Sequence, residues 1–567
     1  MLLAAKAAAL AGRHVALSFW SPFAFIWQDV LVALLFAAVD ARLKRPRLAW
    51  LAYAAVACYV AINVPVARVL WTPLTWMMLR AARGPLADSV WHYATFSSLL
   101  ALIIPIAVAA VLPLALRRRR FSLPRSALAA AVCVLALGPF ASSRIETRGL
   151  HRNAFGALAA TSVPRLDAAA GADDWRQSPY QTATGSDLRS FRGAMRGRNV
   201  VLIALESTAA RHLGLYGGTP DPMPNLTALA GQAITFERAY AVYPESIKGL
   251  FATLCSRYPA FDTAPDVYAE VPCAALPAAL HTAGYRTALF HSGRFMYLGM
   301  RSVIDRRGFD VLEDAGDIGG QVESSFGVDD ASTVARMLGW IDSLDGAAPF
   351  FITYLPTSGH NPYVTRAPGP FRADHDFWRY MNALHEGDDA LGQFIAGLRR
   401  RGLDRRTLFV IYGDHGEAFG EHPGNFAHSL FIHEENVRVP LVIAAAGEIT
   451  DPIRVSRVAS LLDTAPTILD LLGLPAEGAQ QGATLLDPDE RMALFFTDYA
   501  TGWLGLTDGC WKYVYQLDTT RSRLFDVCRD PGETHDRAPD APDRVARYRD
   551  RVVAWAAAQK ARIERRE

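Results

Sequence analysis

The stretch "NVVLIALESTAARHLGLYGG", Asn199–Gly218, decides the fold of the second part of the chain. Its first seven residues are an unbroken apolar and β-branched run, and polar residues follow from Glu206 onward. A run of this kind is typical of a strand buried on both faces of a parallel sheet. The polar residues would then stand at the carboxyl end of the strand, where such sheets collect their ligands.

Similar apolar runs recur later in the chain and alternate with helical stretches, of which Thr333–Leu344 and Trp378–Leu398 are examples. This alternation predicts an α/β domain with a mainly parallel sheet covered on both faces, over residues 199–567. The runs are "RTALFHSG", "PFFITYLPTSGH", "RTLFVIYGDHGE" and "VPLVIAAAG", and polar residues follow them at His291, His360, Asp414 and His415.

The front of the chain has a different character, and it accounts for much of the 51% hydrophobic content of the 567 residues. A span of about 20 apolar residues crosses a hydrocarbon core of about 30 Å. We therefore expect an α-helical transmembrane domain over residues 1–142 and a polar linker over residues 143–198. The four predicted spans are Val15–Val39, Leu48–Val69, Phe96–Leu116 and Ser126–Ala141.

Clusters of arginine and lysine set the expected orientation. "RLKRPR", Arg42–Arg47, separates the first two spans, and "RRRRFSLPR", Arg117–Arg125, separates the last two. Basic loops of this kind are retained on the cytoplasmic side. The large domain should therefore lie outside the cytoplasm. The formal net charge of +2 and the lack of a basic arm indicate no nucleic-acid partner.

The six cysteines divide between the two parts of the chain. Two of them, Cys58 and Cys133, fall in predicted spans and are expected to be plain apolar residues. The other four allow three pairings. We favour Cys255–Cys273 and Cys510–Cys528, because each bond closes a short local loop. An oxidising compartment, which the predicted orientation supplies, permits both bonds.

A metal site is the chemistry that the polar strand ends suggest. Asp414 and His415 directly follow a strand, and the glycines on either side of the pair permit a tight turn. Together with Glu206 and the hydroxyl of Ser246, they would make one centre that holds a divalent cation and activates the serine as a nucleophile. Carboxylate and imidazole ligands favour zinc or manganese, with magnesium or calcium as the alternatives. A plain turn at Asp414 is the structural alternative.

Two further histidines are candidates for contacts with a substrate. His360 follows one strand, in "SGHNPY", and His428 lies a short way beyond the Asp-His pair. Each could donate to substrate oxygens or protonate a leaving group. The alternative for each is a hydrogen-bonded histidine of a loop.

Four ordered motifs together resemble the sulfatase branch of the alkaline phosphatase superfamily, over Asn199 to Glu533. With spans in front, the chain resembles the membrane-anchored phosphoglycerol and phosphoethanolamine transferases, such as lipoteichoic acid synthases. The resemblance implies a multi-pass protein of the bacterial inner membrane, with a phospholipid donor and an envelope glycan or lipid as acceptor. The motifs are "NVVLIALESTAARHLGLYGG…MPNLTALAGQAITFERAYA", "CSRYP", "YGDHGEAFGEH…EENVRVPLVI" and "GCWKYVY…LFDVCRDPGE".

The resemblance also implies a role for individual residues. Ser246 falls at the position of the family nucleophile, and Glu206, Asp414 and His415 look like the metal ligands around it. The residues that resemble substrate contacts are His360 and His428, with Lys248 and Arg301 as weaker candidates for contacts with oxyanions.

The sequence departs from the sulfatases at the nucleophile. Hydrolytic sulfatases have Cys or Ser, then Pro or Ala at the third place and Arg at the fifth, and convert the first residue to formylglycine. Here the run is Ser246–Leu250, with Lys248 at the third place and leucine at the fifth. The lipid-using transferases generally have threonine where this chain has Ser246. A plain hydroxyl favours transfer at phosphorus over sulfate-ester hydrolysis.

Three functional hypotheses follow. The leading one is a metal-dependent transferase that moves a phospholipid-derived headgroup, phosphoglycerol or phosphoethanolamine, through a covalent Ser246 intermediate. The second is a membrane-tethered hydrolase of phosphodiesters or sulfate esters. The third is a catalytically inactive member that binds anionic lipid as a sensor. The sensor is disfavoured because all four predicted metal-centre residues are of usable type.

Overall fold

The computed structural model describes residues 1–12, 18–43, 45–81, 95–116, 124–169, 171, 174–180, 185–321, 326–476, 478 and 480–566. The chain divides into two compact units. Unit 1 comprises Met1–Arg165, Asp498–Gly502 and Gln516–Arg521, and unit 2 comprises the rest.

Unit 1 is helical, and four of its helices are long and apolar enough to cross a membrane, as predicted. The first spanning helix begins at Ser21 instead of Val15, and part of the difference, residues 13–17, lies outside the described residues. Most of the basic loop Arg117–Arg125 lies outside them as well. The helices are α1 (Leu2–Leu10), α2 (Ser21–Asp40), α3 (Pro46–Leu70), α4 (Trp76–Ala81), α6 (Phe96–Leu116), α7 (Arg125–Arg144) and α8 (Ala154–Ser162).

Unit 1 also holds two segments from far along the chain. The buried guanidinium of Arg152 lies 2.7 Å from Asp518 and donates to the carbonyl of Ala500. Thr75 donates to the carbonyl of Tyr499. The segment predicted as a linker, 143–198, is shared between the units, with its first part in unit 1 and the part from Leu166 in unit 2.

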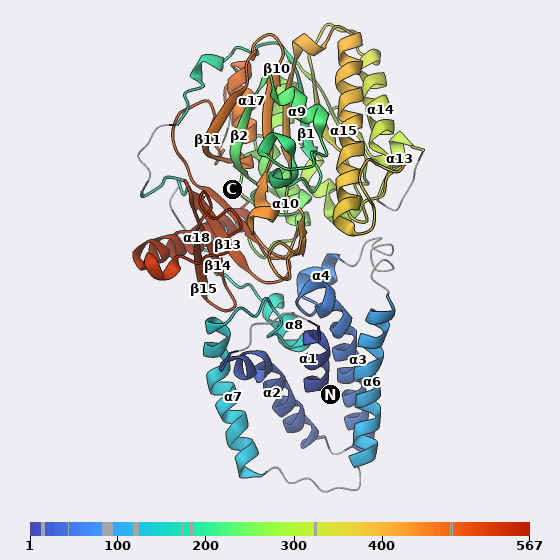
Figure 1. Cartoon of the computed structure of the whole chain (residues 1–567), viewed down its shortest axis with the longest axis vertical. Coiled ribbons are helices and arrows are strands. Elements are labelled where there is room, and N and C mark those ends of the chain that lie inside the picture. Colours follow the sequence, from blue (N-terminus) through green and yellow to red (C-terminus); the bar gives the residue numbers. More distant parts are fainter. Residues whose placement is uncertain are drawn as a thin grey trace. The chain divides into compact units, whose positions relative to one another are not determined.

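Unit 2 is built on a mixed, mostly parallel nine-stranded sheet, which confirms the predicted α/β class (Figure 1). Within this sheet β10 runs antiparallel to both of its neighbours, and β9 (Arg438–Val439) pairs with β2 outside the main order. The order is β11 (Ile453–Ser460), β2 (Ala233–Tyr240), β10 (Leu441–Ala445), β6 (Thr407–Gly413), β1 (Asn199–Leu205), β5 (Phe350–Leu355), β3 (Arg286–His291) and β4 (Val311–Glu313).

Helices cover both faces of this sheet, and each face has its own apolar core. Val200 and Leu202 of β1 belong to one core, and Val201 and Ile203 belong to the other. This alternation is the period-two geometry of a strand, so the continuous apolar run is explained by burial on both sides. One core includes α10 (Ser246–Cys255) and α17 (Thr464–Leu472), and the other includes α14 (Asp330–Ser343) and α15 (Asp376–Arg400), which lie together beside the sheet in Figure 1.

A second sheet of four strands follows, and then a final helix, α18 (Pro542–Glu564). Both predicted disulfides are present, Cys255–Cys273 at the end of α10 and Cys510–Cys528 beside the second sheet. The strands are β12 (Ala493–Thr497), β13 (Trp503–Asp508), β14 (Trp511–Gln516) and β15 (Arg521–Asp526). A small antiparallel pair, β7 (Ala418–Phe419) and β8 (Phe426–Ala427), follows the Asp-His turn.

Candidate metal centre and nucleophile

The register of two neighbouring strands brings the first two acidic residues together. β1 and β6 are parallel, and Leu205 at the end of one is paired with Gly413 at the end of the other. Glu206 and Asp414 are the next residues, so both leave the sheet side by side. The turn is fixed by Asp414, whose Oδ1 accepts a hydrogen bond from the backbone N–H of Ser207 at 3.0 Å.

The serine is placed by the start of a helix. Ser246 is the first residue of α10, and Glu245 caps the helix by accepting hydrogen bonds from the backbone N–H groups of Ile247 and Lys248. A hydroxyl at a helix N-terminus lies at the positive end of the helix dipole, which favours an anionic group bound there.

These segments converge on one buried cluster, which we call the metal-centre cluster: Glu206, Ser246, Asp414 and His415. The Ser246 Oγ lies 2.7 Å from Asp414 Oδ2, 3.1 Å from Glu206 Oε2 and 3.5 Å from His415 Nε2. The ligand atoms of the two acids and the histidine all lie within 4.8 Å of one another. The four predicted metal-centre residues therefore converge on a single site.

The protonation of the cluster suits a divalent cation. Burial and the neighbouring Glu206 carboxylate raise the pKa of Asp414 well above its usual range. Burial and the nearby His428 lower the pKa of His415 to about 4, so this ring is neutral at physiological pH. Its Nδ1 lies 3.1 Å from the carbonyl of Gly416, which accepts the N–H and leaves the Nε2 lone pair facing the acids. Two acids with a neutral imidazole are a fitting ligand set for one divalent ion.

His428 lies beside this cluster, with its ring centroid 4.2 Å from that of His415. Its Nδ1 is 2.7 Å from the Oε2 of the fully buried Glu417, which also accepts a 2.6 Å hydrogen bond from the hydroxyl of Tyr363. Burial opposes the charged form of His428, but the Glu417 carboxylate outweighs it and raises the pKa of His428 to about 9. The ring therefore carries a proton at neutral pH.

His360 is the second histidine near the cluster, and its ring centroid lies 6.4 Å from that of His428. Its Nδ1 faces the carbonyl of Asn361 at 2.6 Å, and its ring packs against Phe326 at 4.3 Å between centroids. The two histidines predicted as substrate contacts thus lie near each other, while the contacts themselves stay a prediction.

The two weaker candidates lie in other surroundings. Lys248 is buried in α10, with its ammonium over the ring of Tyr243 and 3.4 Å from the carbonyl of Ala260. Arg301, at the start of a short helix, is more than half exposed and lies 3.4 Å from Asp305. A role for either in binding oxyanions also stays a prediction.

Sequence reasoning missed Glu417, which pairs with His428, and Tyr363, which donates a hydrogen bond to Glu417. Glu417 stands two residues after His415 in "GDHGE", so its proximity to the site was available from the sequence. Its pairing with His428 was not, because the short β7–β8 hairpin brings that histidine back. Tyr363 is the last residue of the quoted "SGHNPY", three residues after His360, but its hydrogen bond to Glu417, 54 residues further along, carried no signal in the sequence.

Comparison with known proteins agrees with the fold of unit 2. The family model described as Sulfatase matches residues 198–474. Those residues form a sulfatase-family domain. Two solved structures share its fold. A protein in the alkaline phosphatase superfamily from Vibrio parahaemolyticus superposes with a TM-score of 0.55 at 21% identity, covering 69% of this chain and 93% of that one. The lipoteichoic acid synthase LtaP from Listeria monocytogenes superposes with a TM-score of 0.55 at 17% identity, covering 66% of this chain and 94% of that one.

Two curated relatives show the range of the sulfatase-family similarity. Lipoteichoic acid synthase 2 from Bacillus subtilis (strain 168) is 25% identical over 326 residues, which cover 54% of this chain and 50% of that protein. Arylsulfatase K from Bos taurus is 32% identical over 183 residues, 29% of this chain and 33% of that protein. The chain thus spans half or less of the length of these relatives. These similarities confirm the predicted resemblance to the sulfatase-like and lipoteichoic acid synthase-like branch. They also support the prediction that the protein is an enzyme.

Proposed function

We propose that this protein is a metal-dependent transferase that moves a phospho-headgroup, phosphoglycerol or phosphoethanolamine, from a membrane phospholipid onto an envelope glycan or lipid. The observation that carries the proposal is the position of Ser246, whose hydroxyl lies within hydrogen-bonding distance of both acids of the metal-centre cluster. Four apolar helices in the same chain support a lipid donor, because they would hold the catalytic unit at the membrane.

The residues of the metal-centre cluster would hold a single divalent cation, zinc or manganese in preference to magnesium or calcium. When bound, such a cation would neutralise the two acids and lower the pKa of the Ser246 hydroxyl, so that its proton is lost to solvent. Glu206 and Asp414 aim the serine oxygen, and the N-terminus of α10 favours the anionic phosphoryl group beside it.

The reaction would proceed in two displacements at phosphorus. In the first, the Ser246 oxygen forms a bond to phosphorus while the bond from phosphorus to the diacylglycerol oxygen breaks. His428 gives its proton to that leaving oxygen. In the second, an acceptor hydroxyl bonds to phosphorus as the Ser246 ester breaks, and the acceptor proton passes to His428.

We further propose that the chain is a multi-pass protein of a bacterial cytoplasmic membrane, with unit 2 outside the cytoplasm. Two disulfides in unit 2 support an oxidising location for that unit. Labelling of an introduced cysteine with a membrane-impermeant maleimide in intact cells tests the orientation. Labelling of unit 2 only after the cytoplasmic membrane is permeabilised would contradict it.

The test of the reaction is intact-mass analysis of the detergent-solubilised chain after incubation with defined phospholipids and a divalent metal. We expect an adduct on Ser246 with the mass of a phosphoglycerol or phosphoethanolamine group. A lack of adduct with every donor, under conditions where metal is bound, would contradict the proposal.

Hydrolysis is the second candidate, and the similarity to Arylsulfatase K favours it. The two activities share the first displacement and differ in the acceptor, which is water for a hydrolase. Release of the free headgroup at the same rate with and without an acceptor alcohol would support hydrolysis instead of transfer.

A further inference from the structure

Ser207 is a buried residue at the metal-centre cluster to which the proposed function gives no role. It follows Glu206 directly and is fully buried. Its hydroxyl donates to Glu206 Oε1 at 2.9 Å, and its backbone N–H donates to Asp414 Oδ1 at 3.0 Å. One residue thus contacts both acids that would hold the cation.

The two hydrogen bonds from Ser207 engage one oxygen of each carboxylate. Asp414 Oδ1 also accepts the backbone N–H of His415 at 2.7 Å, so both of its lone pairs are taken. The other two oxygens, Glu206 Oε2 and Asp414 Oδ2, are the ones that lie 3.1 Å and 2.7 Å from Ser246 Oγ. Ser207 therefore holds each acid with a defined oxygen toward the nucleophile.

The backbone of Ser207 is held in a conformation that residues with a side chain rarely adopt. Its φ is +53°, in the left-handed region. The hydroxyl of the buried Tyr380 donates to the Ser207 carbonyl at 2.8 Å, and a Cβ on Gly359 would collide with the carbonyl of Glu206. Strained backbone of this kind persists where its surroundings fix it, and it is common at functional sites.

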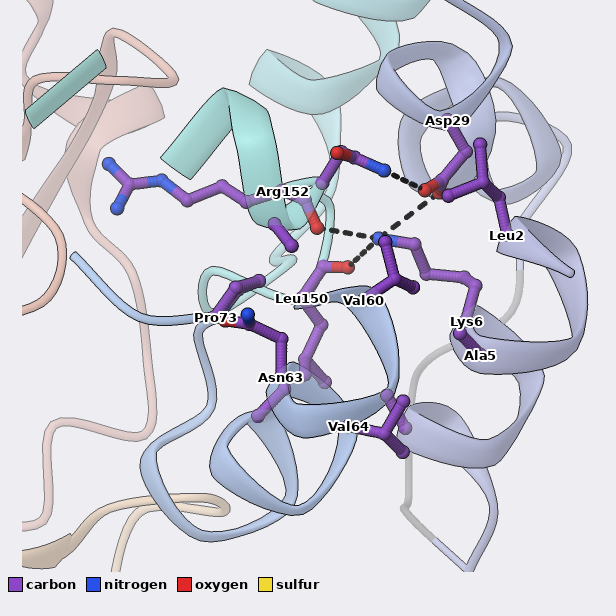
Figure 2. Close-up of a pocket in the computed structure, with 14 residues that line it drawn as sticks. Leu2, Ala5, Lys6, Asp29, Val60, Asn63, Val64, Pro73, Leu150 and Arg152 are labelled. Carbon is purple, nitrogen blue, oxygen red and sulfur yellow. Dashed lines mark hydrogen bonds and ion pairs between the residues drawn. The ribbon is translucent and has the colours of Figure 1, made fainter. Parts of the chain in front are cut away.

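A buried acid of unit 1 shows how the chain satisfies a carboxylate without a metal. Asp29 Oδ1 accepts a hydrogen bond from Asn153 Nδ2 at 2.6 Å. Its Oδ2 lies 3.4 Å from the ammonium of Lys6 (Figure 2). Both oxygens of Asp29 are thus engaged, one of them by a cation. Ser207 brings only neutral donors to its two acids, so their charge is not balanced by these contacts.

We propose that Ser207 is a positioning residue of the metal centre, and that it sets the choice of metal by restricting Glu206 and Asp414 to one oxygen each. One oxygen from each acid, with His415 Nε2 and Ser246 Oγ, gives a four-ligand set of the kind that zinc prefers. Calcium takes about six to eight oxygens and accepts both oxygens of one carboxylate. The inference rests on the proposed function for the presence of a metal, and it requires no transfer step.

Loss of the Ser207 hydroxyl should release the second oxygen of Glu206. That oxygen, Oε1, lies 3.5 Å from His415 Nε2, so it already faces another of the ligand atoms. Without the hydrogen bond from Ser207, both oxygens of Glu206 would be available to one cation. The added oxygen ligand favours calcium at the expense of zinc.

The test measures the metal affinity of the full chain with Ser207→Ala, in detergent and without substrate. The protein is dialysed against buffered zinc or buffered calcium, and bound metal per chain is measured by mass spectrometry. We expect the affinity for zinc to fall about 10- to 100-fold, the usual cost of removing a hydrogen-bond partner of a metal ligand, and the affinity for calcium to fall less or to rise. An equal loss for both metals, or no loss for zinc, would overturn the inference.

Two further variants separate the hydroxyl from the backbone. Ser207→Gly also removes the hydroxyl, but glycine adopts a positive φ without strain and keeps the N–H to Asp414, so we expect the same loss of preference for zinc. Thr208→Val is the control, because the hydroxyl of the buried Thr208 donates to the backbone carbonyl of Glu206 at 3.0 Å and not to the carboxylate. Recovery of the preference in Ser207→Gly, or its loss in Thr208→Val, would contradict the inference.

The inference and the proposed function can fail separately. If Ser207→Ala binds both metals as the unmodified chain does, and the unmodified chain forms the Ser246 adduct, the inference is wrong and the transferase stands. If the preference for zinc depends on Ser207 and no phospholipid gives an adduct, the transferase is wrong and the inference stands. An unmodified chain that binds neither metal overturns both.

Discussion

Two buried clusters of acids and histidines in unit 2 have similar composition and opposite electrostatics. One is the metal-centre cluster, in which His415 lies 3.5 Å from both Glu206 and Asp414 and is a ring that burial keeps neutral. The other, which we call the lysine cluster, consists of Lys512, Glu434, Glu533, His433 and His422. In each cluster three side chains place ligand atoms within 4.8 Å of one another, close enough to hold one metal ion. They are Glu206, Asp414 and His415 in the first cluster, and His422, His433 and Glu533 in the second.

The lysine cluster has a cation of its own. The fully buried Lys512 Nζ lies 3.0 Å from an oxygen of Glu434 and 3.0 Å from an oxygen of Glu533. Burial opposes the charged ammonium, but these two carboxylates outweigh it and raise the pKa of Lys512 above its ordinary value. The rings of His422 and His433 stack at 3.7 Å with an angle of 9° between them, so their in-plane lone pairs do not converge on one point.

The difference teaches how to separate a structural cluster from a functional one. In the lysine cluster the chain supplies the cation, Lys512, which neutralises the carboxylates of Glu434 and Glu533, so the cluster stabilises the fold. In the metal-centre cluster the nearby protonated His428 is paired with Glu417, so Glu206 and Asp414 have no protonated side chain in ion-pair contact among the described residues. An external cation would neutralise them, and the hydroxyl of Ser246 lies between them. Each prediction below tests one side of this comparison.

The largest effect is expected from Ser246→Ala. Removal of the attacking oxygen should lower turnover by about 10⁴-fold or more, as for other catalytic nucleophiles. Headgroup transfer and metal content per chain are the measurements, and metal content should change little because three ligands remain. Ser292→Ala is the control, a buried serine that donates to Thr333. Residual adduct formation in Ser246→Ala would show that another group attacks.

Next is Asp414→Asn, which removes one negative charge from the metal-centre cluster. We expect bound metal to fall to near zero and turnover to drop by roughly 10³-fold, since a catalytic metal contributes several kcal/mol. Metal per chain is measured by mass spectrometry after dialysis. His433→Asn, in the lysine cluster, is the matched control and should keep the metal. A loss of metal in His433→Asn would break the distinction between the clusters.

Lys512→Met should affect stability instead of metal binding. It leaves the Glu434 and Glu533 carboxylates buried without their cation, and breaking a buried pair in this way costs about 3–5 kcal/mol of unfolding free energy. Urea or thermal unfolding measures the loss. Lys560→Met is the control, because the buried Lys560 donates to the carbonyl of Leu166, and its loss should cost only about 1 kcal/mol. A smaller loss of unfolding free energy in Lys512→Met than in the control would show that the lysine cluster does not stabilise the fold.

The smallest effect is expected from Glu417→Gln, which should shift the pH dependence of turnover. The raised pKa of His428 keeps its proton available below about pH 9, so activity that needs this proton is lost as pH rises through that value. Without the Glu417 carboxylate the pKa of His428 should fall, and the alkaline limb of turnover should move to lower pH. At neutral pH the loss is about tenfold or more if His428 is the acid. An unchanged alkaline limb would exclude His428 from that role.

Much of the fold of unit 2 could be predicted because the sequence patterns that indicate it lie within short stretches of the chain. The unbroken apolar run at Asn199–Leu205 requires burial on both faces, and only an inner strand of a covered sheet provides that. The spans, too, follow from length and hydropathy alone. Short spacing was enough for the disulfides, since Cys255 and Cys273 are separated by 18 residues.

The sequence by itself thus determined the two kinds of domain and the residue types of the candidate metal centre, because each depends on residue type and neighbouring residues. Only the tertiary structure decided which acids face a cation of the chain and which do not. Glu417 meets His428 through a hairpin, and Asp29 meets Lys6 between two helices. Electrostatic energy depends on distance in space and on burial, and neither is fixed by separation along the chain.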